Sequence, residues 1–171
     1  MQIRRAESGD AKGMARVHVD SWRTTYKEIV HQRFLDSMSY SERENRWSRQ
    51  IMDQEVFVAE NEEGTIVGFA AGGKERSGAY PDFDGELYAI YLLEEVQGQG
   101  IGKALVKRVA HSLLKKGYNS MLVLVLAKNR SRYFYESLGA VQIHTEVETI
   151  GGERYEEAVY GWKSIKCINE E

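Results

Sequence analysis

The part of the chain that most constrains the fold lies between residues 86 and 127. It contains two strongly apolar segments, 86–93 (ELYAIYLL) and 120–127 (SMLVLVLA), which are typical of buried strands. Between them, residues 101–116 repeat apolar side chains every four positions, which predicts an amphipathic helix that ends before Gly117. Two apolar strands joined through such a helix require a sheet that is covered by helices. The predicted fold class is therefore α/β.

The rest of the chain extends this pattern on both sides. It contains one proline and no Pro- or Ser-rich linker, so we expect a single domain over residues 1–171. The expected order is β-α-α-β-β-β-α-β-α-β-β, a mixed sheet with helices on both faces. The expected elements outside 86–127 are a strand at 2–6, a helix at 11–27, a helix that opens with the capping box Ser41–Glu44, a hairpin over 56–71, a short helix at 130–138, and strands at 141–149 and 156–165.

Composition and charge exclude several classes of protein. The 23 basic and 26 acidic residues give a formal charge of -3, whereas nucleic-acid-binding proteins usually carry a basic excess. The longest apolar run, 121–127, is too short to cross a membrane, and the polar N-terminus does not resemble a signal peptide. The single cysteine, Cys167, excludes an internal disulfide, and no metal-ligand spacing is present. We therefore expect a cytoplasmic protein without a metal, acting on neither nucleic acid nor membranes.

Residues 97–103 (QGQGIGK) are the most informative segment for function. Glycines alternate at positions 98, 100 and 102, directly after a buried strand and directly before a helix. Backbone N–H groups converge at such a place, the helix N-terminus adds partial positive charge, and the missing side chains let a phosphate approach. This segment is therefore predicted to bind a phosphate-bearing ligand rather than to be a plain flexible turn.

Two common phosphate-binding motifs do not match this segment. A Walker A loop requires Ser or Thr where Ala104 stands and a glycine where Gln97 stands. A dinucleotide fingerprint requires a third glycine at positions occupied by lysine and leucine, which disfavours a nucleotide-binding regulatory module. The spacing that does fit is Gln-x-x-Gly-x-Gly, at Gln97, Gly100 and Gly102.

This spacing resembles the acetyl-CoA motif of the GCN5-related N-acetyltransferases (GNAT), Arg/Gln-x-x-Gly-x-Gly/Ala at the start of a helix. A second block, 129–140 (NRSRYFYESLGA), is similar to the family's Asn…Phe-Tyr-Glu-x-Leu-Gly-Phe/Ala segment, and the order of elements matches over nearly the whole chain. The resemblance implies a GNAT-type, mostly antiparallel sheet of six to seven strands. It also implies acetyl transfer from acetyl-CoA to a primary amine of a small molecule or peptide, by direct attack in a ternary complex.

The resemblance assigns roles in holding acetyl-CoA to individual residues. The backbone of the strand before the loop would hydrogen-bond the pantetheine arm, and a splay between this strand and the next would open a slot for the thioester. The amides of the glycine segment would hold the pyrophosphate. Asn129 would contact the cofactor arm, with a pure helix cap as its alternative role. The complete cofactor-binding set is Ile90, Tyr91, Leu92, Gln97, Gly98, Gln99, Gly100, Ile101, Gly102, Lys103 and Asn129.

Two residues are candidates for the chemistry itself. Glu86 matches a glutamate that many family members carry, and it would take the proton of the attacking amine. Strict alternation along the strand places it on one face with Tyr88, Ile90 and Leu92; the alternative is a solvated residue at a strand edge. Tyr135 matches the family's recurring tyrosine and would protonate or contact the departing sulfur, with a packed, hydrogen-bonded tyrosine as the alternative.

The acceptor would meet the first two helices and the final hairpin. Trp22 and Tyr26 are the candidate substrate residues, since aromatic rings near carboxylates suit a cationic amine, although their helical spacing is equally typical of a core. For His18 and His31, packed or solvated roles are favoured over ligand binding. A non-catalytic acetyl-CoA sensor is the alternative function. Members of the family often form dimers, so a homodimer is one expected assembly.

Overall fold

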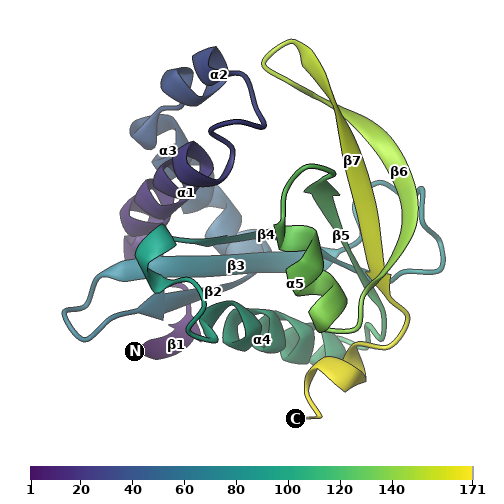
Figure 1. The fold of residues 1–171 in the computed structure, drawn as a ribbon. Coiled ribbons are helices and arrows are strands. Elements are labelled where there is room, and N and C mark those ends of the chain that lie inside the picture. Colours follow the sequence, from purple (N-terminus) through teal and green to yellow (C-terminus); the bar gives the residue numbers. More distant parts are fainter. Residues whose placement is uncertain (171) are drawn as a thin grey trace.

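The computed structural model describes residues 1–170, and a seven-stranded sheet runs through them (Figure 1). The strands are ordered β1-β2-β3-β4-β5-β7-β6, and every neighbouring pair is antiparallel except β4–β5. The predicted mixed, mostly antiparallel sheet is confirmed. The strands are β1 (Gln2–Arg5), β2 (Glu55–Glu60), β3 (Ile66–Lys74), β4 (Gly85–Leu92), β5 (Met121–Leu126), β6 (Val141–Ile150) and β7 (Glu153–Trp162).

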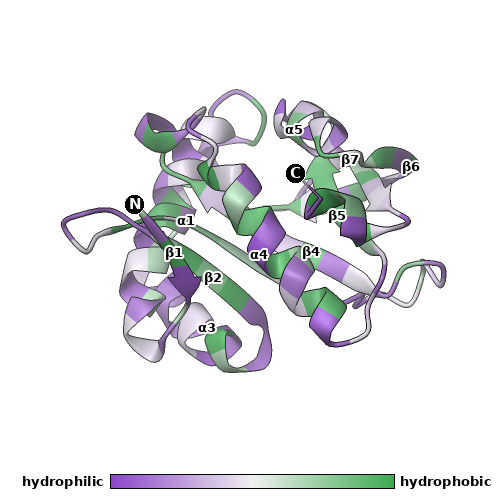
Figure 2. Cartoon of the chain, turned by 90° about the horizontal axis from the view of Figure 1, so that it is seen from below, coloured by the Kyte–Doolittle hydropathy of each residue, from purple (hydrophilic) through white to green (hydrophobic). Residues whose placement is uncertain are grey.

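Helices cover both faces of this sheet. In Figure 1, α1 and α3 lie on one side of β2–β4 and α4 lies on the other. Figure 2 shows apolar and polar residues alternating around α4, whose four-spaced stripe from Ile101 to Leu113 is buried as predicted. The helices are α1 (Ala11–Thr25), α2 (Gln32–Ser37), α3 (Tyr40–Asp53), α4 (Ile101–Lys115) and α5 (Ser131–Ser137).

Two local features differ from the sequence-based prediction. The short helix α2 was not predicted, because its six residues are too few to show a helical period. The helix α3 begins at Tyr40 rather than after Ser41, because the hydroxyl of Ser39 accepts the N–H of Glu42 at 3.3 Å. Two overlapping serine–glutamate pairs fit the capping pattern, and the earlier pair is the one used.

The strand β4 contains a bulge that changes which residues share a face. Ala71 of β3 pairs with Ala89, but the next residue, Gly72, pairs with Leu87, so Tyr88 is an extra residue in β4. A Cβ on Gly72 would lie 2.6 Å from the side chain of Val109, which shows that this side of the pair faces α4.

The bulge separates Glu86 from the residues that follow it. Ile90 and Leu92 pair with β3 residues that point toward α4, and an added Cβ on Gly68, the partner of Leu92, would meet Leu105 of that helix. Glu86 lies on the opposite face, because its neighbour Leu87 faces α4. The prediction that Glu86, Ile90 and Leu92 share one face is therefore wrong, because alternation is reset by the bulge.

The parallel pairing between β4 and β5 ends early. It consists of Gly85, Glu86 and Leu87 with residues 121–123, and no pairing between the two strands continues beyond them. Figure 1 shows the two strands diverging from this point. On its β5 side, the remaining backbone of β4 over residues 88–92 has no sheet partner. The separation creates the space in which the candidate site lies.

Candidate active site

A cleft of about 970 Å³ opens where β4 and β5 separate. Its walls come from the second halves of both strands, the glycine segment with the start of α4, the helix α5 and the end of α1. Most of the residues singled out from the sequence meet here. The predicted site residues that line the cleft are Tyr26, Ile90, Tyr91, Leu92, Gln97, Gly98, Gly100, Gly102, Lys103, Asn129 and Tyr135.

The glycine segment forms the mouth of this cleft at the N-terminus of α4. Gly98 and Gly100 have φ values of +73° and +81°, which favour glycine, and a Cβ on either would project into open space. The first intrahelical bond runs from Ala104 N to Gly100 O, so the amides of Ile101 and Gly102 lie ahead of the first hydrogen bond of the helix. These N–H groups and the positive end of the helix dipole fit an anionic ligand.

Two residues of the predicted cofactor set do not line the cleft. The side chain of Gln99 turns back, and its Nε2 donates to the Glu95 carbonyl at 3.1 Å. Ile101 is buried in the core beneath the loop. Both can contribute backbone amides only. Gln97 does line the cleft, and its Nε2 donates to the Leu92 carbonyl at 3.3 Å, which ties the loop to the end of β4.

Asn129 is a buried cap that also joins two elements. Its Oδ1 accepts the N–H of Ser131 at 2.9 Å, at the start of α5. Its Nδ2 donates to the hydroxyl of Tyr26 at 3.1 Å, at the end of α1. The capping role is confirmed, and the amide group additionally fixes Tyr26 against the cleft wall.

Tyr135 lies on the cleft wall with its ring largely buried. It packs edge-on against Trp162, with ring centroids 6.1 Å apart. Burial, reinforced by the nearby Tyr91, raises the pKa of Tyr135, so its hydroxyl keeps its proton at neutral pH. Burial raises the pKa of Tyr26, Tyr88 and Tyr91 as well. The cleft wall therefore carries four protonated phenols.

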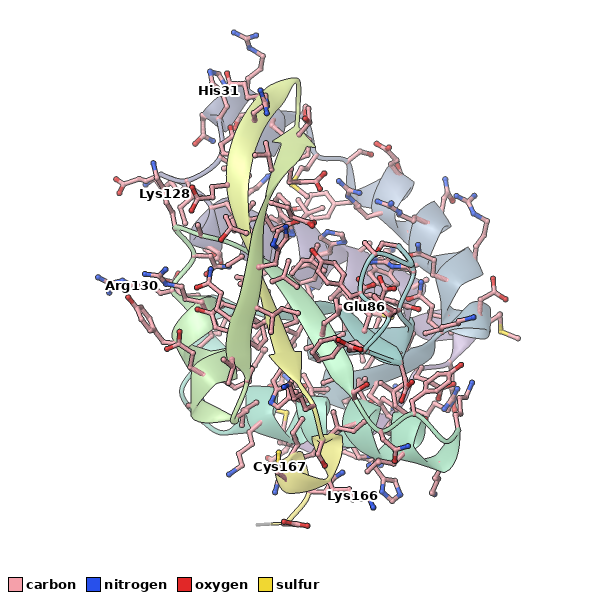
Figure 3. All side chains as sticks on the ribbon, turned by 90° about the vertical axis from the view of Figure 1, so that its right-hand side faces the viewer. His31, Glu86, Lys128, Arg130, Lys166 and Cys167 are labelled. Atoms are coloured by element: carbon pink, nitrogen blue, oxygen red, sulfur yellow. The ribbon has the colours of Figure 1, made fainter. Side chains whose placement is uncertain are left out.

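Glu86 is buried beside the cleft but does not line it. Its carboxylate accepts from the Arg76 guanidinium at 2.9 Å and from the Arg76 backbone N–H at 3.2 Å. The same guanidinium lies 3.9 Å from the ring centroid of Tyr88. Figure 3 shows Glu86 well inside the outline of the molecule. Glu86 thus fastens the loop at residues 76–84 to β4 and is not solvated as the alternative expected.

Trp22 belongs to a packed cluster instead of the cleft wall. Its ring lies 4.3 Å from that of Tyr26 and 6.0 Å from that of Phe34. Its indole N–H is buried without a hydrogen-bond partner. Of the two candidate substrate residues, the structure places Tyr26 alone on the cleft.

His18 is a packed histidine, as expected. Its Nδ1 accepts the indole N–H of Trp47 at 3.1 Å, and its ring stacks on Tyr91 at 4.6 Å. Burial, with the nearby cations Arg43 and Arg46, lowers its pKa to about 3. His31 is exposed and caps α2 by accepting the Arg33 N–H, beside the tip of the β6–β7 hairpin in Figure 3.

Sequence reasoning missed Glu157. This residue of β7 is only 9% exposed, and its Oε1 has no hydrogen-bond partner. The alternation of Ala158, Tyr160 and Trp162 toward the core places position 157 on the opposite face, which was the available signal. The alternation of side chains along β7 predicts which face Glu157 lies on. It does not predict that Glu157 is buried, because burial depends on the elements that cover that face.

Within residues 1–170, no group of three His, Cys, Asp or Glu side chains could hold a metal ion. None of the helices in these residues combines the length and the apolar composition that crossing a bilayer requires.

Comparisons with known proteins decide the family. The model of the Acetyltransferase (GNAT) family matches residues 14–140. The chain is 43% identical over 166 residues to the uncharacterized N-acetyltransferase YuaI of Bacillus subtilis (strain 168), covering 97% of this chain and 95% of that protein. The chain belongs to the GNAT family. As a GNAT enzyme, it is an acetyl-CoA-dependent acyltransferase, as the sequence motifs implied.

Solved structures support the same fold for this acetyltransferase. A GCN5-related N-acetyltransferase from Rhodopseudomonas palustris has a TM-score of 0.74 at 17% identity, covering 94% of this chain and 93% of that one. The PaiA N-acetyltransferase of Thermoplasma acidophilum, solved in complex with coenzyme A, has a TM-score of 0.69 at 20% identity, covering 92% and 96%.

Gly100→Val should weaken acetyl-CoA binding by about 100-fold or more, because a branched side chain would project into the open space before the α4 amides. Isothermal titration with acetyl-CoA measures the change. Gly117→Val is the matched control, since Gly117 has a φ of +85°, also faces open space, and lies at the other end of α4. It should lose comparable stability and keep its affinity. Equal affinities for both variants would contradict the assignment of the loop.

Protonation of His18 should destabilise the fold in acid. Its pKa falls from 6.5 to about 3 on folding, so below pH 6.5 the unfolded chain binds more protons and stability is lost as the pH drops. Between pH 7.5 and 5, the wild type should lose about 2 kcal/mol more unfolding free energy than His18→Gln. Denaturant titrations at both pH values measure this. His111→Gln, an exposed substitution, should behave as the wild type, and a parallel loss in His18→Gln would refute the argument.

Proposed function

We propose that this protein transfers an acetyl group from acetyl-CoA to a primary amine of a small molecule or peptide, by direct attack in a ternary complex. The observation that carries the proposal is the early end of the β4–β5 pairing at Leu87 and Val123. From that point a continuous cleft runs to Gly98 and Gly100 at the start of α4. One end suits an anion and the other is lined by apolar and phenolic side chains, which matches a long ligand with a charged head and a reactive tip.

The chain's own groups would hold and orient acetyl-CoA, which supplies an activated acyl group as a thioester. The backbone edge of β4 on its β5 side, at Ile90, Tyr91 and Leu92, would bind the pantetheine amides in the manner of an added strand, and Gln97 would release the Leu92 carbonyl that it now bonds. The amides of residues 98–103 would bind the pyrophosphate, since they surround the positive end of α4. This arrangement leaves the acceptor to approach from the face that Glu86 and the β6–β7 hairpin share.

Tyr135 is the proposed proton donor to the departing sulfur. Its hydroxyl is protonated at neutral pH because burial raises its pKa, and the residue lines the cleft. A donor that is already protonated and held by packing against Trp162 needs no rearrangement when negative charge develops.

Glu86 is the proposed group that takes the amine proton, and its contacts with Arg76 set a condition on this role. Both carboxylate oxygens are occupied by Arg76, so a direct role requires this pair to open. The contacts favour an additional role as a positioning residue that holds the loop at 76–84 against β4. Because Glu86 is buried and does not line the cleft, the structure also gives some support to the second candidate function, a non-catalytic acetyl-CoA sensor.

The domain extent, location, partners and assembly of this acetyltransferase are also proposals. We infer that residues 1–171 act as one acetyltransferase unit in the cytoplasm, on an amine acceptor and not on nucleic acid or a membrane. The match to one relative over 97% of the chain and the formal charge of -3 support this inference. A homodimer is the assembly that the family resemblance favours.

Thermal unfolding with and without acetyl-CoA, followed by a free-thiol assay over a panel of amines, separates enzyme from sensor. Acetyl-CoA at about 100 times its dissociation constant should add about 2.7 kcal/mol to the unfolding free energy. Thiol release with an amine would support the enzyme. Stabilisation without release on any amine would favour the sensor, and no stabilisation would reject both.

Tyr135→Phe should lower kcat about 10- to 100-fold while the dissociation constant of acetyl-CoA stays within about twofold. The phenylalanine ring keeps the packing against Trp162 and removes only the hydroxyl. Steady-state kinetics and calorimetry give the two quantities. Tyr133→Phe, an exposed substitution on the same helix, is the control and should leave both unchanged. Equal losses of turnover and binding would indicate a packing role.

Substitution of both partners tests the two roles of Glu86. If it takes the amine proton, Glu86→Gln should lower kcat about 100-fold and remove the pH dependence that this carboxylate gives to kcat, while Arg76→Met should keep a pH-dependent kcat because the carboxylate remains. If it only fastens the loop, both variants should lower kcat by a similar, smaller factor with the profile retained. The pH dependence of kcat for the two variants decides between these roles.

A further inference from the structure

Two glutamates face each other across the β6–β7 pair. Glu146 of β6 and Glu157 of β7 are direct partners in the register. Like charges at such positions are destabilising, and here one of them is buried. The Oε1 atom of Glu157 has no hydrogen-bond partner. Burial, the charges of Glu148 and Glu146 and a side-chain hydrogen bond with Glu146 raise the pKa of Glu157 to about 7, so ionising both carboxylates together carries a cost.

Glu157 lies on the face of the sheet that is covered by α1, α2 and the loop at 76–84. Glu157 shares its face with Val159 and Gly161, which pack against Phe83 of the loop at 76–84. Its partner in β5 is Leu126, which packs in a cluster with residues of α1 and α2. Glu157 therefore points into the space between the hairpin, α1 and this loop.

Aromatic hydroxyls surround the same space. Tyr80 of the loop donates its hydroxyl to Oε2 of Glu146 at 2.7 Å, and its ring lies 6.2 Å from that of His144. Tyr26, at the end of α1, is close enough for the charge of Glu157 to contribute to its raised pKa. Because Tyr26 also lines the cleft, the acidic pair adjoins the cleft without forming part of its wall.

The missing partner of Glu157 is best supplied by an organic cation. A positive group beside the two carboxylates would satisfy the orphaned oxygen and remove the repulsion in one step. A metal ion is disfavoured, since no group of three suitable ligands exists in residues 1–170. The phenol rings of Tyr80 and Tyr26 suit an ammonium or guanidinium group.

We propose that Glu157 and Glu146 form a subsite for a second, non-reacting cationic group of the acceptor, so that the preferred substrate is a diamine or an amine with a guanidinium group. This inference rests on the proposed function. The reacting amine must be neutral to attack, and two carboxylates would hold it protonated. The pair therefore suits the group that stays charged while the other amine enters the cleft.

The test compares linear diamines of increasing length with amino alcohols of the same lengths. For the best pair, the wild type should show kcat/KM at least about tenfold higher for the diamine, the size expected for a charge-assisted contact. Glu157→Gln should reduce this preference to within about twofold and leave the amino alcohol unaffected. Glu146→Gln should also reduce it. Glu156→Gln, an exposed change of the same charge on the opposite face of β7, should retain the full preference.

A binding measurement keeps the test independent of turnover. The best diamine should raise the unfolding midpoint of the wild type and not that of Glu157→Gln, whereas the amino alcohol should shift neither. This shift would support the subsite even if acetyl-CoA failed to bind, an outcome that would reject the proposed function alone. Absence of both the preference and the shift would overturn the subsite. An equal loss of turnover on both acceptors in Glu157→Gln would also overturn it, since that is the behaviour of a general base.

Discussion

The end of the β4–β5 ladder is the constraint on which the rest of the site depends. Parallel strands that stayed paired would satisfy each other's backbone groups and leave no slot between them. Because pairing stops at Leu87 and Val123, the later backbone of β4 needs another partner. The glycine segment that follows β4 then opens at the mouth of the same slot, where the amides of Ile101 and Gly102 lie ahead of the first hydrogen bond of α4. The unpaired backbone of β4, which can bind amide groups, therefore leads directly to the start of α4, which can bind an anion.

The bulge at Tyr88 places the side chains before it and those after it on different faces of β4. Past it, Ile90 and Leu92 turn toward α4 and the core, so this strand is anchored while its edge stays free. Before it, Glu86 turns to the acceptor face and binds Arg76. That contact fixes the loop whose Tyr80 reaches Glu146 in β6. The β-bulge at Tyr88 is thus what places Glu86 on the acceptor face of β4, and Ile90 and Leu92 beside the cofactor cleft on the other face.

The features that sequence could predict are those fixed locally. Glycines before a helix, the stripe from Ile101 to Leu113 and the cap at Asn129 depend on neighbours within a few residues, and all are present. The features that it missed depend on register between distant strands. The bulge at Tyr88 exists only relative to β3, and the confrontation of Glu157 with Glu146 only relative to β6. Alternation alone cannot reveal either, because one extra residue reverses every face that follows.

Burial acts in opposite directions on two of the buried titratable groups, His18 and Glu157. It makes His18 neutral by lowering its pKa, and it favours neutral Glu157 by raising its pKa to about 7 from 4.5. A raised carboxyl pKa means that the folded chain holds the extra proton, so stability falls as pH rises from about 4.5 to 7. The Nδ1 of His18 already accepts the indole N–H of Trp47. Glu157 has an empty acceptor position, so a cation bound there would lower its pKa again and expel the proton. Acceptor binding and proton release would then be linked at Glu157.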